Sequence, residues 1–467
     1  MKKILIAFLF WGCAILGQHP NEQTISKELT YNEFLGYVKK YHPLVKNANL
    51  EISKAQANLM MARGGFDPKI EVDFSQKKFK DKEYYSILNS SFKIPTWYGI
   101  ELKAGFDNNE GVYLNPENTT PNNGLTSFGI TVPVGQGLFI NQRMADVRMA
   151  KIQIRLSQAE RKLQAVTVLY DASLAYFNWK KNFEEMKLYE NYNKNAEIRL
   201  EGIKSLIVQG DKPAIDSIEA GIIVRNRALS LEDSKLKLAK ARLELSNFMW
   251  MENNIPLEIS DELVPENALE STLQETLKTN DLLQNDFSLE THPKLNALQN
   301  KIEILTVEKD LKQNMLLPKI NVGYSYLSEP SYIDNYRFDD YKIGLEFYFP
   351  LFLRKERGSL RLAKYKLQEN QFALALERTQ LTNKISAQKI EINSLVKQKK
   401  LAKDLVENNL TMLNSEERLF SFGESSLFLI NTRENNLVSA KLASIALENR
   451  FYISNSELFK IMANPDL

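Results

Sequence analysis

The stretch HPLVKNA at residues 42–48 and the stretch HPKLNA at residues 292–297 open two segments of the same design. In each segment a His-Pro pair leads into helical spacing, and a second proline, Pro68 or Pro318, follows the first by 25 positions. After that proline the pattern changes to strict alternation of apolar and polar residues. Because the chain has only three histidines, this agreement predicts an internal repeat, and therefore two similar halves.

Alternating apolar residues predict β-strands in both halves. The runs lie at residues 70–74, 84–94, 100–106 and 128–132 in the first half, and at 320–326 and 343–349 in the second. Their lengths approach the roughly 9–11 residues that a tilted membrane strand needs, and Tyr and Phe crowd their ends, as interfacial girdles require. Alternation alone leaves a membrane sheet and an ordinary soluble sheet equally open.

Two very long helices are predicted after the strands, over residues 134–208 and 354–422. About 70 helical residues would span roughly 105 Å. Gly210 and Gly423, each followed by an acid, break these helices, and a second helix returns after each break. The first returning helix carries a heptad-like seam, formed by Ile215, Ile218, Ile222, Leu229, Leu236 and Leu243. Small and polar residues on a second face suit helices arranged around a water-filled tube, and a solvated coiled coil is the alternative.

Composition and the N-terminus favour an exported protein. Residues 1–17 combine two lysines with a short apolar core and predict a signal peptide. A lipoprotein cut before Cys13 is the alternative, but the residues before Cys13 make a poor lipobox. Cleavage at either position removes Lys2 and Lys3. The net charge of the mature chain therefore falls from +2 to 0. No basic field indicates nucleic acid.

These features divide the chain into four expected parts. After the signal peptide, residues 18–250 form the first repeat, with a β-hairpin over 69–133 and a tip near residue 210. Residues 251–291 join the halves as an equatorial segment without a strong signal. Residues 292–467 form the second repeat, with a hairpin over 319–349 and a tip near residue 423.

With these features, the chain resembles the TolC family of outer-membrane efflux channels over nearly all of its mature length. The resemblance rests on the duplicated His-Pro segments, on the helix entries PVGQG (133–137) and PLFL (350–353), and on the tip GDKPAIDSIEA (210–220). The second tip, GESSLFLI (423–430), fits less well and is one residue shorter. The specificity lies in the duplicated order of these motifs and not in any single one.

The resemblance implies an α+β membrane protein. Family members are homotrimers that pool strands, usually four per chain, into one outer-membrane β-barrel, which a long periplasmic α-helical barrel continues. The sequence departs from this pattern because it has six alternating runs. The implied partners are outer-membrane lipid, a periplasmic adaptor protein and an inner-membrane pump, and the implied function is the exit duct of a tripartite efflux or secretion system.

The candidate site is therefore the pair of tips. Gly210, Asp211 and Lys212 at the first tip, with Gly423 and Glu424 at the second, are the expected adaptor-binding residues. Asp216, Glu219 and Glu424 are the candidates for an acidic aperture. Asp216 and Glu219 share a helix face, but acids near a helix N-terminus can also simply complement the helix dipole.

Other classes of protein fit less well. The chain has none of the common nucleophile, zinc or phosphate-binding motifs, so we expect no enzyme, no cofactor and no metal. His42 and His292 are predicted to cap helices. A type I protein secretion conduit and a non-channel periplasmic coiled-coil scaffold are the remaining alternatives, and the chain does not identify the transported substrate.

Overall fold

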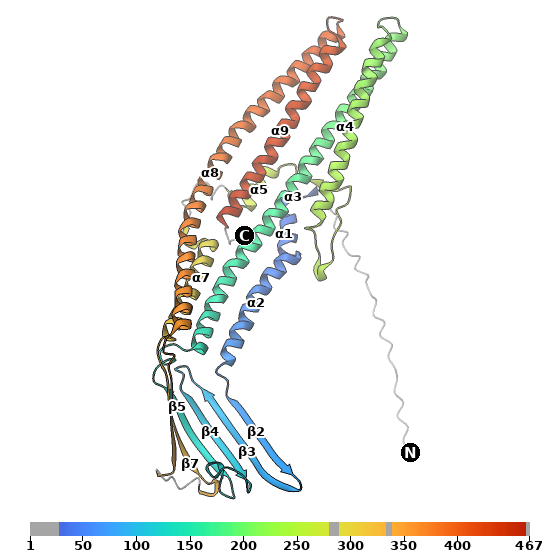
Figure 1. Ribbon diagram of the computed structural model, residues 1–467. Coiled ribbons are helices and arrows are strands. Elements are labelled where there is room, and N and C mark those ends of the chain that lie inside the picture. The colour runs from blue at the N-terminus through green and yellow to red at the C-terminus, as the bar shows by residue number, and fades with distance from the viewer. Residues whose placement is uncertain (1–27, 280–288, 333–338, 464–467) are drawn as a thin grey trace, which may run out of the picture.

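The computed structural model describes residues 28–279, 289–332 and 339–463. The expected signal peptide and Cys13 lie outside the described residues. The long helices rise from one end of a β-sheet and finish in two separate tips (Figure 1). The helices are α1 Tyr31–Tyr41, α2 Pro43–Gly64, α3 Gln142–Val208, α4 Ile215–Ser246, α5 Leu269–Thr276, α7 Pro293–Asn314, α8 Arg354–Ser421 and α9 Leu427–Met462, with short 3₁₀ turns at Pro116–Asn118, Glu252–Asn254, Leu289–Thr291 and Pro330–Tyr332.

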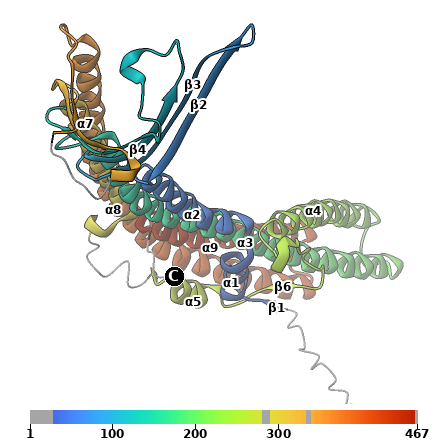
Figure 2. The same ribbon diagram turned by 90° about the horizontal axis from the view of Figure 1, so that it is seen from below.

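One antiparallel sheet contains six strands, which lie side by side in the order β2-β3-β4-β5-β7-β8. The strands are β2 Lys69–Phe79, β3 Lys82–Pro95, β4 Glu101–Glu110, β5 Leu125–Pro133, β7 Lys319–Ser328 and β8 Tyr341–Tyr348. The expected single hairpin over residues 69–133 is therefore wrong, because this segment folds into four strands. Lys80 and Asp81, between β2 and β3, adopt positive φ angles and form the tight turn of the β2–β3 hairpin. Figure 2 shows β2 at the free edge of the sheet.

The sheet has one apolar and one polar face. Cross-strand pairing fixes which side chains share a face, because neighbours in register point to the same side. One such row is apolar through five strands: Ile94, Leu102, Ile130, Tyr324 and Ile343. The next row points to the opposite side and is polar: Lys93, Lys103, Gly129, Ser325 and Lys342.

The long helices form a layer. Helix α3 has 67 residues and α8 has 68, so each spans about 100 Å at 1.5 Å per residue. Asn141 starts α3 by accepting a hydrogen bond from the amide of Met144 (2.9 Å). Leu156, Ala159 and Val166 of α3 follow one another at spacings of 3 and 7 and are buried, so they form a heptad-spaced packing face. Helices α8, α9, α3 and α4 follow one another across the layer in Figure 1.

Helix α4 packs on α3 with a face other than the seam identified in the sequence. The buried positions are Ala220, Arg227, Leu231, Ser234, Leu238, Ala241 and Leu245. The seam identified in the sequence, from Ile215 to Leu243, is 51–70% exposed at its six positions. A helix with two apolar stripes can pack against two neighbours, and a single chain supplies only one of them.

The main core lies at mid-height, where α1 and α5 cover one side of the long helices (Figure 2). Tyr31 and Phe34 of α1 pack against Tyr176 of α3, with ring centroids 5.4 and 5.5 Å away. Strand β1, Glu28–Leu29, pairs in parallel with β6, Val264–Pro265. The inter-repeat segment thus contributes a strand and a helix to this core, which the sequence did not predict because both elements are very short.

The predicted histidine caps are confirmed. His42 Nδ1 accepts a hydrogen bond from the amide of Leu44 at 3.2 Å, and His292 Nδ1 accepts one from Lys294 at 3.1 Å. Burial lowers the pKa of both histidines below the ordinary value, which favours the neutral ring that this acceptor role requires. Across the described residues, no helix is at once long and apolar enough to span a membrane.

Candidate functional site

The two predicted tips lie at the end of the molecule farthest from the sheet (Figure 1). Gly210 and Gly423 have φ angles of 85° and 77°, a left-handed conformation that glycine adopts without steric cost. In each tip the amide of the next residue, Asp211 or Glu424, returns to a helix carbonyl, of Leu206 at 2.9 Å or Leu419 at 3.0 Å. Both glycines therefore end a long helix by the same hydrogen-bonded turn.

The structure brings the two tip hairpins into contact. Ile203 of α3, Ala220 of α4 and Leu427 of α9 form a small buried cluster, and Phe420 of α8 packs against it. The ammonium group of Lys212 lies 5.1 Å from the centre of the Phe420 ring. A predicted tip residue of the first half thus contacts the helix end of the second half.

The candidate aperture acids occupy different environments. Asp216 is half-buried in the first turn of α4, whereas Glu219 and Glu424 are exposed. Asp216 and Glu219 lie on the same helix, but Glu424 belongs to the other tip. The position of Asp216 in the first turn fits the helix-dipole explanation, and its neighbour Glu219 leaves the acidic-collar explanation open as well.

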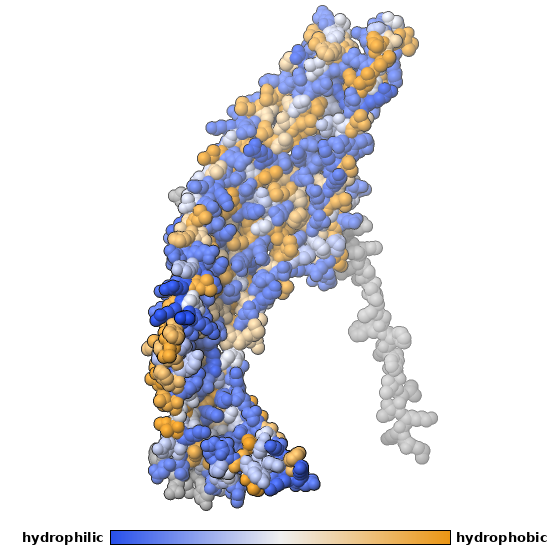
Figure 3. All heavy atoms as spheres, viewed as in Figure 1, coloured by the Kyte–Doolittle hydropathy of each residue, from blue (hydrophilic) through white to orange (hydrophobic). Residues whose placement is uncertain are grey.

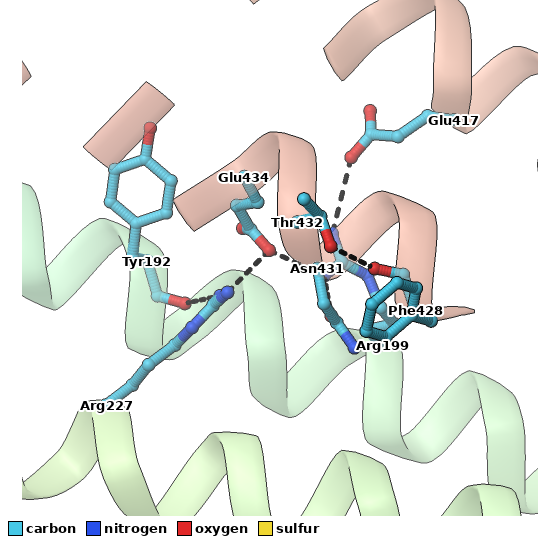
Figure 4. A network of polar contacts seen from close by, with 8 residues as sticks. All are labelled: Tyr192, Arg199, Arg227, Glu417, Phe428, Asn431, Thr432 and Glu434. Carbon is cyan, nitrogen blue, oxygen red and sulfur yellow. Dashed lines mark hydrogen bonds and ion pairs between the residues drawn. The ribbon is translucent and has the colours of Figure 1, made fainter. Parts of the chain in front are cut away.

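A buried ionic cluster lies behind the tips and joins both hairpins (Figure 4). Glu434 of α9 has a side chain that is 1% exposed. Its Oε2 atom accepts hydrogen bonds from Arg199 Nη1 of α3 and Arg227 Nη2 of α4, both at 2.6 Å. Arg199 also contacts Glu417 of α8 at 3.3 Å. We call Arg199, Arg227, Glu417 and Glu434 the hairpin clamp, because they connect all four helices.

The hairpin clamp keeps Glu434 ionised. Burial alone would raise the pKa of its carboxyl group, but the hydrogen bonds and charges of Arg227 and Arg199 outweigh burial and hold that pKa below the ordinary value. Arg227 also donates to the carbonyl oxygen of Tyr192 at 3.1 Å. The clamp thus satisfies a buried carboxylate with two guanidinium groups and links helices that are distant in sequence.

Sequence reasoning missed the clamp. The small and polar residues expected on a second helix face were not assigned to individual positions or partners. The available signal was the second heptad face of α4, on which Arg227 interrupts a series of small and apolar residues. Its carboxylate partner, Glu434, lies 207 positions away in α9, so no local pattern could pair them.

No group of three or more His, Cys, Asp or Glu side chains in the described part of the chain could hold a metal ion. The site brings together helix ends, apolar contacts and ion pairs.

The fold is an amphipathic antiparallel sheet continued by a layer of helices about 100 Å long with paired tips. Residues 286–464 match the family of outer membrane efflux proteins. The resemblance inferred from the sequence is thereby confirmed. A search among curated sequences finds no matching relative.

Solved structures share the fold over almost the whole chain. The Campylobacter jejuni CmeC outer membrane channel aligns with a TM-score of 0.63 and 13% identity, covering 99% of this chain and 94% of its own. The open state of the Neisseria gonorrhoeae MtrE channel aligns with a TM-score of 0.64 and 12% identity, covering 93% and 89%. The outer membrane protein VceC of Vibrio cholerae gives 0.64 and 12%, covering 93% and 96%.

At these identities the structural likeness establishes the fold, and the family match adds the class of function. Together they support an outer-membrane efflux channel that lies in the outer membrane and extends into the periplasm.

Proposed function

We propose that three copies of this chain form the exit duct of a tripartite efflux system. The three six-stranded sheets close into one barrel in the outer membrane, and the helical layers close into a periplasmic tunnel. The tips meet a periplasmic adaptor protein, which connects the duct to an inner-membrane pump. The duct carries no chemistry of its own, and its substrate is chosen mainly by the pump.

This proposal rests on the sheet having one apolar and one polar face. Its apolar face is exposed, as in Ile343, Leu345 and Phe347 of β8, which are 65–72% exposed. A soluble sheet would cover such a face with helices, because burying it is favourable. A lipid bilayer covers it equally well, while the polar face lines an aqueous pore.

The open edges of the sheet support closure with other copies. β2 and β8 are edge strands, and unpaired edges do not occur in the hydrocarbon of a membrane. Because the six strands alternate in direction, β8 of one copy would run antiparallel to β2 of the next. Six strands per chain, instead of the usual four of the family, would also give a wider barrel, since the diameter grows with strand number.

The helical layer has matching open edges. The exposed stripe of α4 faces one side, and the tip half of α8, at the other edge, carries exposed apolar residues such as Val396, Leu401 and Leu405. Packing α4 of one copy against α8 of the next would bury both stripes. This arrangement explains why the strongest seam of α4 is not used within one chain.

The aperture is assigned to Asp216 and Glu219, repeated three times around the tunnel end, with Glu424 as the alternative. Such a collar would favour cations. We would measure single-channel conductance of the detergent-extracted protein in planar bilayers, for the wild type and for Asp216→Ala combined with Glu219→Ala. We expect discrete cation-preferring steps in the wild type and a loss of that preference in the variant.

Each outcome of this experiment decides something. If the double substitution leaves the conductance steps and their ion preference unchanged, the protein is still a channel, but the aperture is then assigned to Glu424. A wild-type protein that stays soluble without detergent and never inserts would overturn the channel in favour of a periplasmic coiled-coil scaffold.

A further inference from the structure

The first turns of α8 are strongly basic. Residues 354–366 contain six Lys or Arg and a single acid, Glu356. Arg354, Arg357, Arg361 and Lys364 follow one another at spacings of 3, 4 and 3, so they form a stripe along one helix face. The other two bases, Lys355 and Lys366, lie away from this stripe.

Within the described parts of the chain, no carboxylate forms an ion pair with the stripe. Among the described residues, the one ion pair recorded for this basic segment joins Lys366 to Glu308 at 3.9 Å, and Lys366 is outside the stripe. The guanidinium of Arg354 lies 5.2 Å from the ring centre of Phe352, a cation–π contact. Arg354, Arg357, Arg361 and Lys364 are all exposed.

The stripe lies directly beside the apolar sheet. The chain enters α8 from β8 through Leu351 and Phe352, which are 87% and 72% exposed. Figure 3 shows a hydrophilic patch over the lower end of α8, immediately above a hydrophobic patch at the top of the sheet. A band of aromatic and aliphatic side chains followed by cations is the order expected on crossing from hydrocarbon to lipid headgroups.

Heptad geometry places the stripe on the side of the helical layer that carries α5. Lys364 precedes Lys399 by whole heptads, so the two share nearly one face of the coiled helix. Lys399 Nζ bonds Glu270 of α5 at 2.7 Å. In the proposed trimer, α1 and α5 would fill the tunnel if they pointed inward. The stripe is therefore on the outer surface, a step that rests on the proposed function.

The first half repeats the arrangement at the start of α3. Arg148 lies 5.9 Å from the ring centre of Trp97, which is stacked on Phe66 at 5.4 Å. Arg148 precedes Tyr176 by whole heptads, and Tyr176 packs against α1. Both junctions between sheet and long helix thus present a cation over an aromatic ring on the outer side.

We propose that Arg148, Arg354, Arg357, Arg361 and Lys364 form a basic collar that binds the phosphate groups of anionic phospholipids in the leaflet facing the periplasm. Guanidinium groups pair with phosphate through two hydrogen bonds. Basic clusters next to a membrane-spanning segment recruit anionic lipid in this way. Together with the neighbouring aromatic residues Phe352 and Trp97, the collar sets the depth at which the sheet sits in the membrane.

The test uses the full-length protein in non-ionic detergent. Mixed micelles carry phosphatidylglycerol with brominated acyl chains, and binding is followed by quenching of tryptophan fluorescence, to which Trp97 beside the collar contributes. The collar variant replaces Arg354, Arg357, Arg361 and Lys364 by Gln. The matched control replaces Lys194, Lys397, Lys400 and Lys403, four exposed cations far from the sheet, in the same way.

We expect the affinity for phosphatidylglycerol to fall at least about tenfold in the collar variant and to remain that of the wild type in the control. Brominated phosphatidylcholine should quench both variants equally. Equal phosphatidylglycerol affinity in all three proteins would overturn the proposal, as would full competition by inorganic phosphate at equal concentration, which would indicate a free-anion site.

Single-channel conductance separates this inference from the proposed function. A collar variant that still forms channels has kept its fold, so a lost lipid response is then specific to the collar. If the wild type forms no channels, the proposed function fails, and the collar is judged by lipid affinity alone.

Discussion

At the scale of single residues, Glu434 is a buried side chain on which two distant contacts converge. It lies between two arginines that come from α3 and α4, while its own helix, α9, belongs to the second half. A buried charge is tolerated only when it is paired and hydrogen-bonded. The pairing therefore holds the two hairpins in one relative position behind the tips.

Replacing Glu434 by Ala should loosen the hairpins by about 3–5 kcal/mol, because two guanidinium groups would stay buried without their carboxylate. Hydrogen exchange measures the effect locally, and amides of α4 and α9 near the clamp should exchange faster while those of α1 stay protected. Glu201→Ala is the control, since Glu201 is 72% exposed in its pair with Lys204 and should change little. Equal effects of the two substitutions would contradict the role of the clamp.

The same carboxylate gives the clamp a defined pH dependence. Its folded pKa lies below the ordinary value of 4.5, so its stabilisation is complete above pH 4.5 and is lost as the pH falls through the folded pKa. Wild-type melting temperatures should therefore drop more steeply below pH 4.5 than those of Glu434→Gln.

At the scale of elements, the alternation of apolar and polar residues predicts the strands of the sheet. The strand runs found in the sequence correspond to the six strands, and the register shows that their apolar residues share one face. What the runs did not show is that β2 and β3 pair as an extra hairpin. Pairing depends on which strands become neighbours, and alternation contains no such information.

Neighbouring residues of the central strand β5 provide a matched test of the two faces. Ile130 is on the apolar face and Thr131 on the polar face. Ile130→Arg should cost up to about 2–4 kcal/mol in the membrane and reduce insertion. Thr131→Arg should insert normally and shift the conductance toward anions. Heat-modifiable mobility on gels reports insertion, and reversal potentials report selectivity.

If both substitutions reduced insertion equally, the two faces would not differ in their surroundings, and the assignment of lipid and water to them would be wrong.

At the scale of the whole molecule, one chain leaves two helical edges and two strand edges without neighbours. Exposed apolar area of this extent marks an interaction surface. A closed ring of copies is the arrangement that leaves no edge, as expected for symmetric oligomers. The unpaired stripes of α4 and α8 and the edges β2 and β8 then have one common explanation.

Leu229→Glu combined with Leu236→Glu should break this assembly. Both residues belong to the exposed stripe of α4, so the chain should keep its helical content while the complex dissociates. Light scattering in detergent should report three chains per particle for the wild type and fewer for the variant. Lys235→Glu with Lys237→Glu, on exposed polar positions of the same helix, should leave three.

A variant that stays trimeric would show that the α4 stripe is not an interface between copies, and the packing of α4 against α8 would have to be abandoned.

The sequence by itself determined the elements of this protein: the duplicated His-Pro starts, the alternating strands, the length of α3 and α8, and the glycines that end them. These features are local, because spacing, capping and turn conformation depend on residues a few positions apart. The tertiary structure alone decided which face of α4 meets α3, that β2 pairs with β3, and that Glu434 joins Arg199 to Arg227. These depend on contacts between distant segments, whose partners no local pattern identifies.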